Sequence, residues 1–305
     1  MKKSILPLYY IVDEQLIMKF SDSQRVYMMD YYYSLYTQHC SKVGRKQLSR
    51  DIFFTNMRRR KVKIIQICCP YCGEIRSIVV EGTIQSTLGM FNYCYHCGKP
   101  STKEHVFKNY ARLYRIISLH RLGISKLLEV QEVDDLKLYT YDIMQLELVE
   151  IESTFEMLMR EFYSTLLFIK YRNVKDNFLK TLIEKDVTND FLNIEKANNH
   201  FKKALGINLK SELDPIDWTD LIDLANLRNT IIHNDGKADL KFGKSQTYKR
   251  VQHMIEDDLI FISAKDIKKY LSKTFKVMEI LNQKLKSEFD KEAPTIIANR
   301  IFNRQ

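Results

Sequence analysis

The 305-residue chain has few of the residues that end helices and strands, with only nine glycines and five prolines. A fold of many short strands needs frequent tight turns, and glycine and proline are the residues that most often form them. Their scarcity argues against a many-stranded fold and favours long helices.

The sequence also lacks an uninterrupted run of about 18 apolar residues, the length that a membrane-spanning helix requires. A short apolar stretch at 5–12 is broken by Pro7 and followed by Asp13 and Glu14, with no small-residue cleavage site after it. We therefore expect no signal peptide, no membrane partner and a cytoplasmic location.

The remaining composition is that of a globular chain, with 45% hydrophobic and 28% charged residues. Its charge is uneven: residues 1–126 hold 21 Lys and Arg against 8 Asp and Glu (+13), and residues 127–305 hold 27 against 30 (−3). The basic part fits a surface that binds phosphate. A solvated basic surface without a partner explains the same charge, so charge alone does not decide.

Tyrosines and cations alternate in the first 63 residues. Three consecutive tyrosines at 31–33 lie on a helix predicted over 22–40. Aromatic residues and cations together can stack bases and neutralise phosphates, but aromatics at helical spacing more often pack in a core, and we favour packing for these tyrosines. The cations that we predict to bind nucleic acid are consecutive: Arg58, Arg59, Arg60 and Lys61.

Two C-x-x-C-G motifs predict a metal site. The candidate ligands are Cys69, Cys72, Cys94 and Cys97, with 21 residues between the second and the third. Two thiolates at this separation chelate one ion, and two such turns complete a tetrahedral S₄ site of the kind that holds zinc. Disulfides are not expected in a reducing cytoplasm, and a lone C-x-x-C is the usual form of a reactive thiol pair.

Three further residues are of types that can bind a metal. Cys68 and His96 lie beside the motifs and could replace one cysteine, whereas Cys40 has the character of a small buried residue. We leave all three out of the site. The segment at 64–100 has short β-branched runs at 64–67 and 75–80, which predict strands. It resembles a zinc ribbon, which implies one structural Zn²⁺ per chain and a role in binding nucleic acid or a partner.

Beyond this segment, apolar residues recur every three or four positions, as on amphipathic helices. The predicted helices cover 104–129, 141–171, 174–185, 189–205, 217–232 and 265–289. They predict a mainly α chain with an antiparallel helical bundle and a small N-terminal β module. The predicted divisions are a basic, tyrosine-rich region at 1–63, the zinc ribbon at 64–103, a basic helix and linker at 104–135, and the bundle at 136–305.

One predicted helix carries a charged residue inside its apolar stripe. On the helix over 217–232, Arg228 falls among Leu221, Leu224, Leu227, Ile231 and Ile232. A partly desolvated guanidinium needs a carboxylate or phosphate partner. Asn229 and His233 are four residues apart and share the adjoining shoulder. This arc presents a phosphate ligand, an amide and a group that titrates near neutral pH.

The run Leu227-Arg228-Asn229-Thr230-Ile231-Ile232-His233-Asn234-Asp235-Gly236 resembles the Arg-x4-His segment of the HEPN superfamily of helical domains. The resemblance covers about 138–290 and implies a HEPN-like bundle that dimerises to form a metal-independent ribonuclease site. It implies that Arg228 binds phosphate, that Asn229 orients the histidine or the phosphate, and that His233 is the general acid-base. The family's acidic helix corresponds to Glu152 and Glu156.

The resemblance further implies an endoribonuclease of toxin or antiphage systems, with RNA as substrate and an antitoxin or defence-system partner. The alternative is a non-catalytic module that binds nucleic acid, nucleotide or a partner, in which Arg228 pairs with Glu152 or Glu156 as a buried ion pair and His233 caps a helix end. A metal-dependent nuclease or protease is a weaker third reading, because no His-Glu-x-x-His and no Walker loop occurs.

Overall fold

The computed structural model describes residues 10–12, 17–18, 20–81, 93–129, 133–172, 176–186 and 189–302. The chain is 73% helical with a small antiparallel sheet near its N-terminus, which confirms the predicted mainly α class with a small β module. Among these residues, no helix combines the length and the apolar character needed to cross a bilayer. Part of the predicted ribbon, 82–92, and part of the predicted linker, 130–132, lie outside the described residues.

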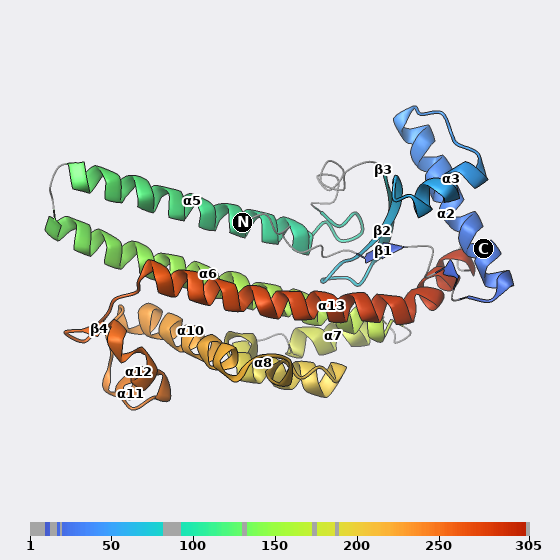
Figure 1. The fold of residues 1–305 in the computed structure, drawn as a ribbon. Helices are drawn as coiled ribbons and strands as arrows, with labels where there is room; N and C mark the ends of the chain where they lie inside the picture. Colours follow the sequence, from blue (N-terminus) through green and yellow to red (C-terminus); the bar gives the residue numbers. More distant parts are fainter. Residues whose placement is uncertain are drawn as a thin grey trace. The chain divides into compact units, whose positions relative to one another are not determined.

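The chain forms two compact units, and each draws on segments that are distant in sequence. Unit 1 comprises Met1–Glu104, Ser164–Lys180 and Asn282–Gln305, and unit 2 comprises His105–Tyr163 and Thr181–Leu281. Two long helices, α6 (Val133–Lys170) and α13 (Ala264–Phe302), contribute residues to both units (Figure 1). The division predicted from composition used consecutive ranges and did not anticipate this sharing.

Unit 1 contains the sheet. Its elements in chain order are β1 (Tyr10–Val12), α2 (Asp22–Val43), α3 (Arg50–Arg58), β2 (Val62–Cys68) and β3 (Ile75–Glu81). β2 lies between β1 and β3, antiparallel to both, with Ile65 opposite Ile78. The two strands predicted over 64–67 and 75–80 are confirmed. β1 and α3 were not predicted.

Two tyrosines of α2 are core residues. Tyr32 and Tyr36 are fully buried, and the Tyr36 ring stacks on Phe53 of α3 with centroids 4.7 Å apart. Tyr33 donates a hydrogen bond from its hydroxyl to the Leu48 carbonyl at 2.8 Å. Packing of this segment, the interpretation that the sequence favoured, is therefore confirmed.

Unit 2 is helical apart from one hairpin. It contains most of α5 (Thr102–Glu129), the first part of α6, and the shorter helices that follow, with β4 paired to β5 near its end. The elements between α6 and α13 are α7 (Asp176–Asp186), η2 (Asn189–Leu192), α8 (Ile194–His200), η3 (Phe201–Leu205), α9 (Leu209–Glu212), α10 (Pro215–Asn234), α11 (Leu240–Gly243), α12 (Gln246–Val251), η4 (Gln252–Met254), β4 (Ile255–Glu256) and β5 (Leu259–Ile260). Of these, α7 up to Lys180 belongs to unit 1.

The core of unit 2 follows the predicted periodicity. Leu148, Ile151, Phe155, Leu158 and Phe162 are all buried on one stripe of α6. Steps of three and four residues place such side chains on one helix face, where burial of each stabilises the fold by roughly 1.5–3 kcal/mol. The single helix predicted over 189–205 is instead η2, α8 and the π-helical η3.

Candidate functional site

Two turns of the same kind present the cysteine pairs. In the first, Gly73 N donates to the Cys69 carbonyl at 3.0 Å, and in the second, Gly98 N donates to the Cys94 carbonyl at 2.8 Å. The glycines have φ of 72° and 71°, which L side chains rarely adopt. Glycine after each second cysteine is therefore required by the backbone of the turn.

The two turns bring four sulfur atoms together. Cys69 Sγ lies 3.7 Å from Cys97 Sγ, and Cys72 Sγ lies 3.7 Å from Cys94 Sγ. The four Sγ atoms all lie within 4.8 Å of one another. A zinc ion with Zn–S bonds of about 2.3 Å in tetrahedral geometry separates its sulfurs by about 3.8 Å. The donor set and its spacing therefore fit a tetrathiolate metal site.

Burial raises the pKa of the Cys69 thiol and raises that of the Cys72 thiol to about 11. Without an ion, both sulfurs therefore hold their protons at neutral pH. Metal binding must displace those protons, because the thiolate is the ligand.

The three other candidate ligands lie outside this cluster of four sulfurs. The Cys68 thiol donates to the carbonyls of Cys69 and Gly73, at 3.8 and 3.7 Å. His96 is exposed, and Cys40 is buried in α2. Within the described part of the chain, the group that could hold an ion contains neither Cys68 nor His96.

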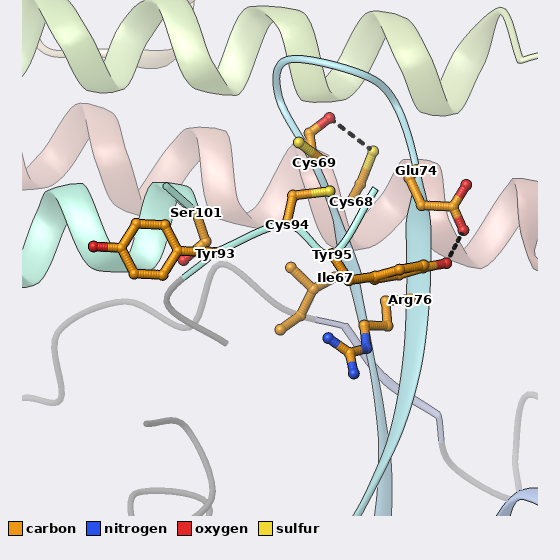
Figure 2. A pocket seen from close by; sticks show the side chains of 9 residues that line it. All are labelled: Ile67, Cys68, Cys69, Glu74, Arg76, Tyr93, Cys94, Tyr95 and Ser101. Carbon is orange, nitrogen blue, oxygen red and sulfur yellow. Dashed lines mark hydrogen bonds between the residues drawn. The ribbon is translucent and has the colours of Figure 1, made fainter. Parts of the chain in front are cut away.

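Aromatic and charged side chains hold the second turn against the sheet. The Tyr95 hydroxyl donates to Glu74 Oε1 at 2.6 Å, and the Arg76 guanidinium lies 4.9 Å from the centre of the Tyr95 ring. Lys99 Nζ lies 4.8 Å from the centre of the Tyr71 ring. A pocket opens beside the sulfurs (Figure 2). It is lined by Ile67, Cys68, Cys69, Glu74, Arg76, Tyr93, Cys94, Tyr95 and Ser101.

The predicted nucleic-acid-binding cations form the turn between α3 and β2. All four of them, Arg58 to Lys61, are exposed, and Arg60 has a φ of 55°. Two other cations of this region pair with acids: Arg45 with Glu81, and Arg50 with Asp30 at 2.7 Å.

The Arg-x4-His segment occupies the second half of α10. Leu221, Leu224 and Leu227 are buried, as predicted for the apolar stripe. Ile232 is 45% exposed, which corrects its predicted place in the stripe. At 3.6 residues per turn it lies about 140° around the helix from Leu227, too far to share the same face.

Arg228 meets one of its two candidate acidic partners. Its Nε lies 3.3 Å from Glu152 Oε2 of α6, and the side chains of Arg228 and Glu152 are 17% and 4% exposed. Neither of these two atoms has a hydrogen-bond partner among the described residues, so the contact is an ion pair without hydrogen-bond geometry. Arg228 Nη1 donates to Asn229 Oδ1 at 3.1 Å.

Glu156 pairs with Arg160 one turn along α6 and does not form the Arg228 ion pair. Burial raises the pKa of Glu152 to about 7, against a lowering by the Arg228 charge. Burial also raises the pKa of Glu156. Glu152 is therefore a buried acid that titrates near neutral pH beside a permanent cation.

His233 is exposed in the last turn of α10. The helix ends at Asn234 and is followed by Asp235 and Gly236, both with positive φ, and Gly236 lies against the Tyr141 and Gln145 side chains of α6. The Gly236 carbonyl accepts a hydrogen bond from Ile260 N of β5 at 3.0 Å. The Asn-Asp-Gly turn therefore contacts both α6 and β5, and these contacts hold the end of the helix that carries His233.

Sequence reasoning missed an ion-pair network on α10. Asp217 contacts Lys273 and Lys276 of α13, and Asp223 contacts Arg250 at 2.5 Å. Acids at 217, 220 and 223 recur every three residues, and lysines at 269, 273 and 276 recur every three or four, a pattern that predicts two facing charged stripes. The network orients α10 and thereby Arg228.

Comparisons with protein-family models, curated proteins and solved structures found no match for this chain.

Proposed function

We propose that the chain is a metal-independent endoribonuclease of the HEPN type that acts through Arg228, Asn229 and His233. The observation that carries the proposal is the disposition of α10. Arg228 is hydrogen-bonded to the Asn229 side chain, and the exposed His233 lies in the last turn of the same helix. The turn that follows packs against α6 and holds this end of the helix. Arg228 Nε is itself buried beside Glu152, so a phosphate would contact Arg228 through the 17% of its side chain that is exposed.

Each residue has one role in this proposal. Arg228 binds the scissile phosphate and stabilises the charge that develops on it in the transition state. His233 removes the proton of the ribose 2′-hydroxyl or protonates the leaving oxygen. Asn229 orients the Arg228 guanidinium, because its amide oxygen accepts the Nη1 proton.

The proposal includes a structural Zn²⁺, one per chain, held by Cys69, Cys72, Cys94 and Cys97. Zinc suits a tetrahedral set of four thiolates, and such closed sites stabilise a small fold without chemistry of their own. Its role is to keep the two turns together so that the basic N-terminal unit recognises nucleic acid.

A second candidate function has an observation of its own. The Arg228–Glu152 contact gives the arginine a carboxylate partner, as a purely structural ion pair would. In that reading the chain is a non-catalytic module that binds nucleic acid, nucleotide or a protein partner.

A nuclease assay separates the two candidates. Purified wild type and His233→Ala are incubated with single-stranded RNA, and His253→Ala serves as control because His253 is another exposed histidine of unit 2. Loss of a general acid-base lowers rates by about 100-fold or more. We expect that loss for His233→Ala alone. No cleavage by wild type would favour the non-catalytic reading, and equal cleavage by all three proteins would overturn the role of His233.

The proposed biological setting is a toxin or antiphage system with an antitoxin or defence-system partner. Overexpression provides the test. Wild type should arrest growth of the host, and His233→Ala should not. Equal growth with both proteins would contradict a toxin.

A further inference from the structure

Two exposed tyrosines flank the pocket beside the cysteines. Tyr93 and Tyr95 are 54% and 62% exposed, whereas Tyr36 of α2, which packs on α3, is 1% exposed. In Figure 2 the two rings lie on opposite sides of Ile67, with Arg76 against one face of Tyr95. Large exposed rings beside an apolar floor are the surface on which nucleic acid bases stack.

Cations stand at both ends of β2, but Ile65 between them is fully buried, so no open track along the sheet joins them. Arg76 is directly opposite Ile67, and alternation along β2 places Lys63 on the same face as Ile67. Lys63 and Ile67 are about 13 Å apart along the strand, at 3.3 Å per residue. The exposed run Arg58 to Lys61 immediately precedes β2, so cations stand at both ends of this face.

The net charge of an occupied metal site would also determine which part of a nucleotide enters the pocket. A divalent ion on four thiolates would carry two net negative charges, which disfavours a phosphate over the sulfurs. An uncharged base meets no such repulsion, and Ile67 and the tyrosine rings provide apolar contact for it. The phosphates are then left to the exposed cations Arg58 to Lys61.

We infer that this pocket binds an unpaired base of single-stranded nucleic acid, stacked on Tyr93 and Tyr95, while the exposed cations Arg58 to Lys61 beyond the far end of β2 attract the strand's phosphates. A base in a duplex is stacked on its neighbours, so only unpaired bases reach the pocket. The inference rests on the proposed nucleic-acid role of unit 1 and is independent of cleavage at Arg228 and His233.

The test uses the full-length His233→Ala protein, which keeps its substrate intact. Binding of labelled 20-nucleotide RNA, DNA of the same sequence and the corresponding duplexes is measured by fluorescence anisotropy at several salt concentrations. Tyr93→Ala and Tyr95→Ala should each weaken binding of single strands by about 10-fold and leave duplex binding unchanged. Tyr95→Phe keeps the ring, and Tyr27→Ala removes an equally exposed tyrosine of α2; both should bind as the parent does.

A second readout reports stacking directly. RNA that carries 2-aminopurine should lose fluorescence on binding the parent protein and much less on binding Tyr95→Ala, with zinc content equal in the two proteins. Single-strand and duplex binding that fall together, or an unchanged single-strand affinity in both alanine variants, would overturn the inference.

Further measurements distinguish a failure of the base-binding pocket from a failure of the proposed function. Equal affinity for RNA and DNA strands would indicate that the protein contacts the bases and phosphates alone. A higher affinity for RNA would indicate that it also contacts the 2′-hydroxyl. Replacing Arg58 to Lys61 by alanine should weaken all nucleic acids and flatten the salt dependence. Absence of binding by the parent protein would refute both the pocket and the nucleic-acid role of unit 1 and would favour a protein partner.

Discussion

Arg228 Nε lies 3.3 Å from Glu152 Oε2, and this contact pairs a permanent cation with a buried acid whose pKa is raised to about 7. The pair joins α10 to α6 within unit 2. Because burial outweighs the attraction of Arg228, the folded state favours protonated Glu152. The cation is therefore held by a partner that loses its charge just below neutral pH, and a substrate phosphate competes with a weakly held carboxylate.

The first prediction concerns stability and pH. The pKa of Glu152 rises from 4.5 to about 7 on folding, so the folded state binds more protons between these values. The contribution to unfolding free energy is complete below pH 4.5 and is lost as pH rises through 7, about 3 kcal/mol in all. Glu152→Gln does not titrate and should therefore gain stability relative to wild type from pH 5 to pH 8 in urea denaturation.

The matched control is Glu256→Gln. Glu256 also pairs with a cation of unit 2, Lys137 at 3.1 Å, but both side chains are more than half exposed. Its difference from wild type should stay within about 0.5 kcal/mol at both pH values. Parallel pH profiles for wild type and Glu152→Gln would show that Glu152 is ionised throughout this range.

Local patterns predicted the longer helices, the two longer strands and the grouping of the four cysteines, because each depends on spacing within a short stretch. The steps of three and four around Leu148 and Phe155 are sufficient to define a helix face. The choice of Glu152 over Glu156 as the partner of Arg228 depends on how α6 and α10 pack, which no local pattern encodes. The hairpin at 255–260 was missed because two-residue strands leave no periodicity to detect.

The second prediction compares the two glycines of the cysteine turns. Gly73 and Gly98 have nearly the same φ, but a Cβ on Gly73 would lie 2.6 Å from Phe168 Cδ1, whereas one on Gly98 meets nothing within 4 Å. Gly98→Ala should cost about 1 kcal/mol for its left-handed backbone. Gly73→Ala should cost about 2 kcal/mol more, because the buried Phe168 ring must move. Thermal unfolding of the zinc-loaded proteins measures the difference, and equal losses would place Phe168 away from this turn.

The third prediction concerns metal binding. Protein purified without chelator should contain one zinc per chain. Cys69→Ser should lower that content, because serine does not replace a thiolate in a tetrathiolate site. Cys68→Ser is the control, because the Cys68 thiol faces backbone carbonyls that a hydroxyl can also meet. Equal loss of zinc from both variants would mean that Cys68 is a ligand.

The fourth prediction separates a structural from a catalytic Arg228. Arg228→Gln alone leaves Glu152 buried without its cation, which should destabilise the protein at pH 8. Combining it with Glu152→Gln removes both charges and should restore much of the stability. Cleavage of RNA should nevertheless stay lost in the double variant, because no guanidinium remains for the phosphate. A stable double variant with wild-type cleavage would make the arginine structural only.

The last prediction is that cleavage needs two chains and no added metal. One chain offers a single Arg228 and a single His233, whereas attack by the 2′-hydroxyl needs a base, an acid and neutralisation of the phosphate charge. Two copies of α10 related by a two-fold axis would supply two histidines and two arginines. Activity per chain should therefore fall on dilution below the dimer dissociation constant, which light scattering measures independently. EDTA that leaves the tightly held zinc in place should not inhibit, and products should end in 2′,3′-cyclic phosphate. An active monomer, or 3′-hydroxyl products that require magnesium, would overturn the roles of Arg228 and His233.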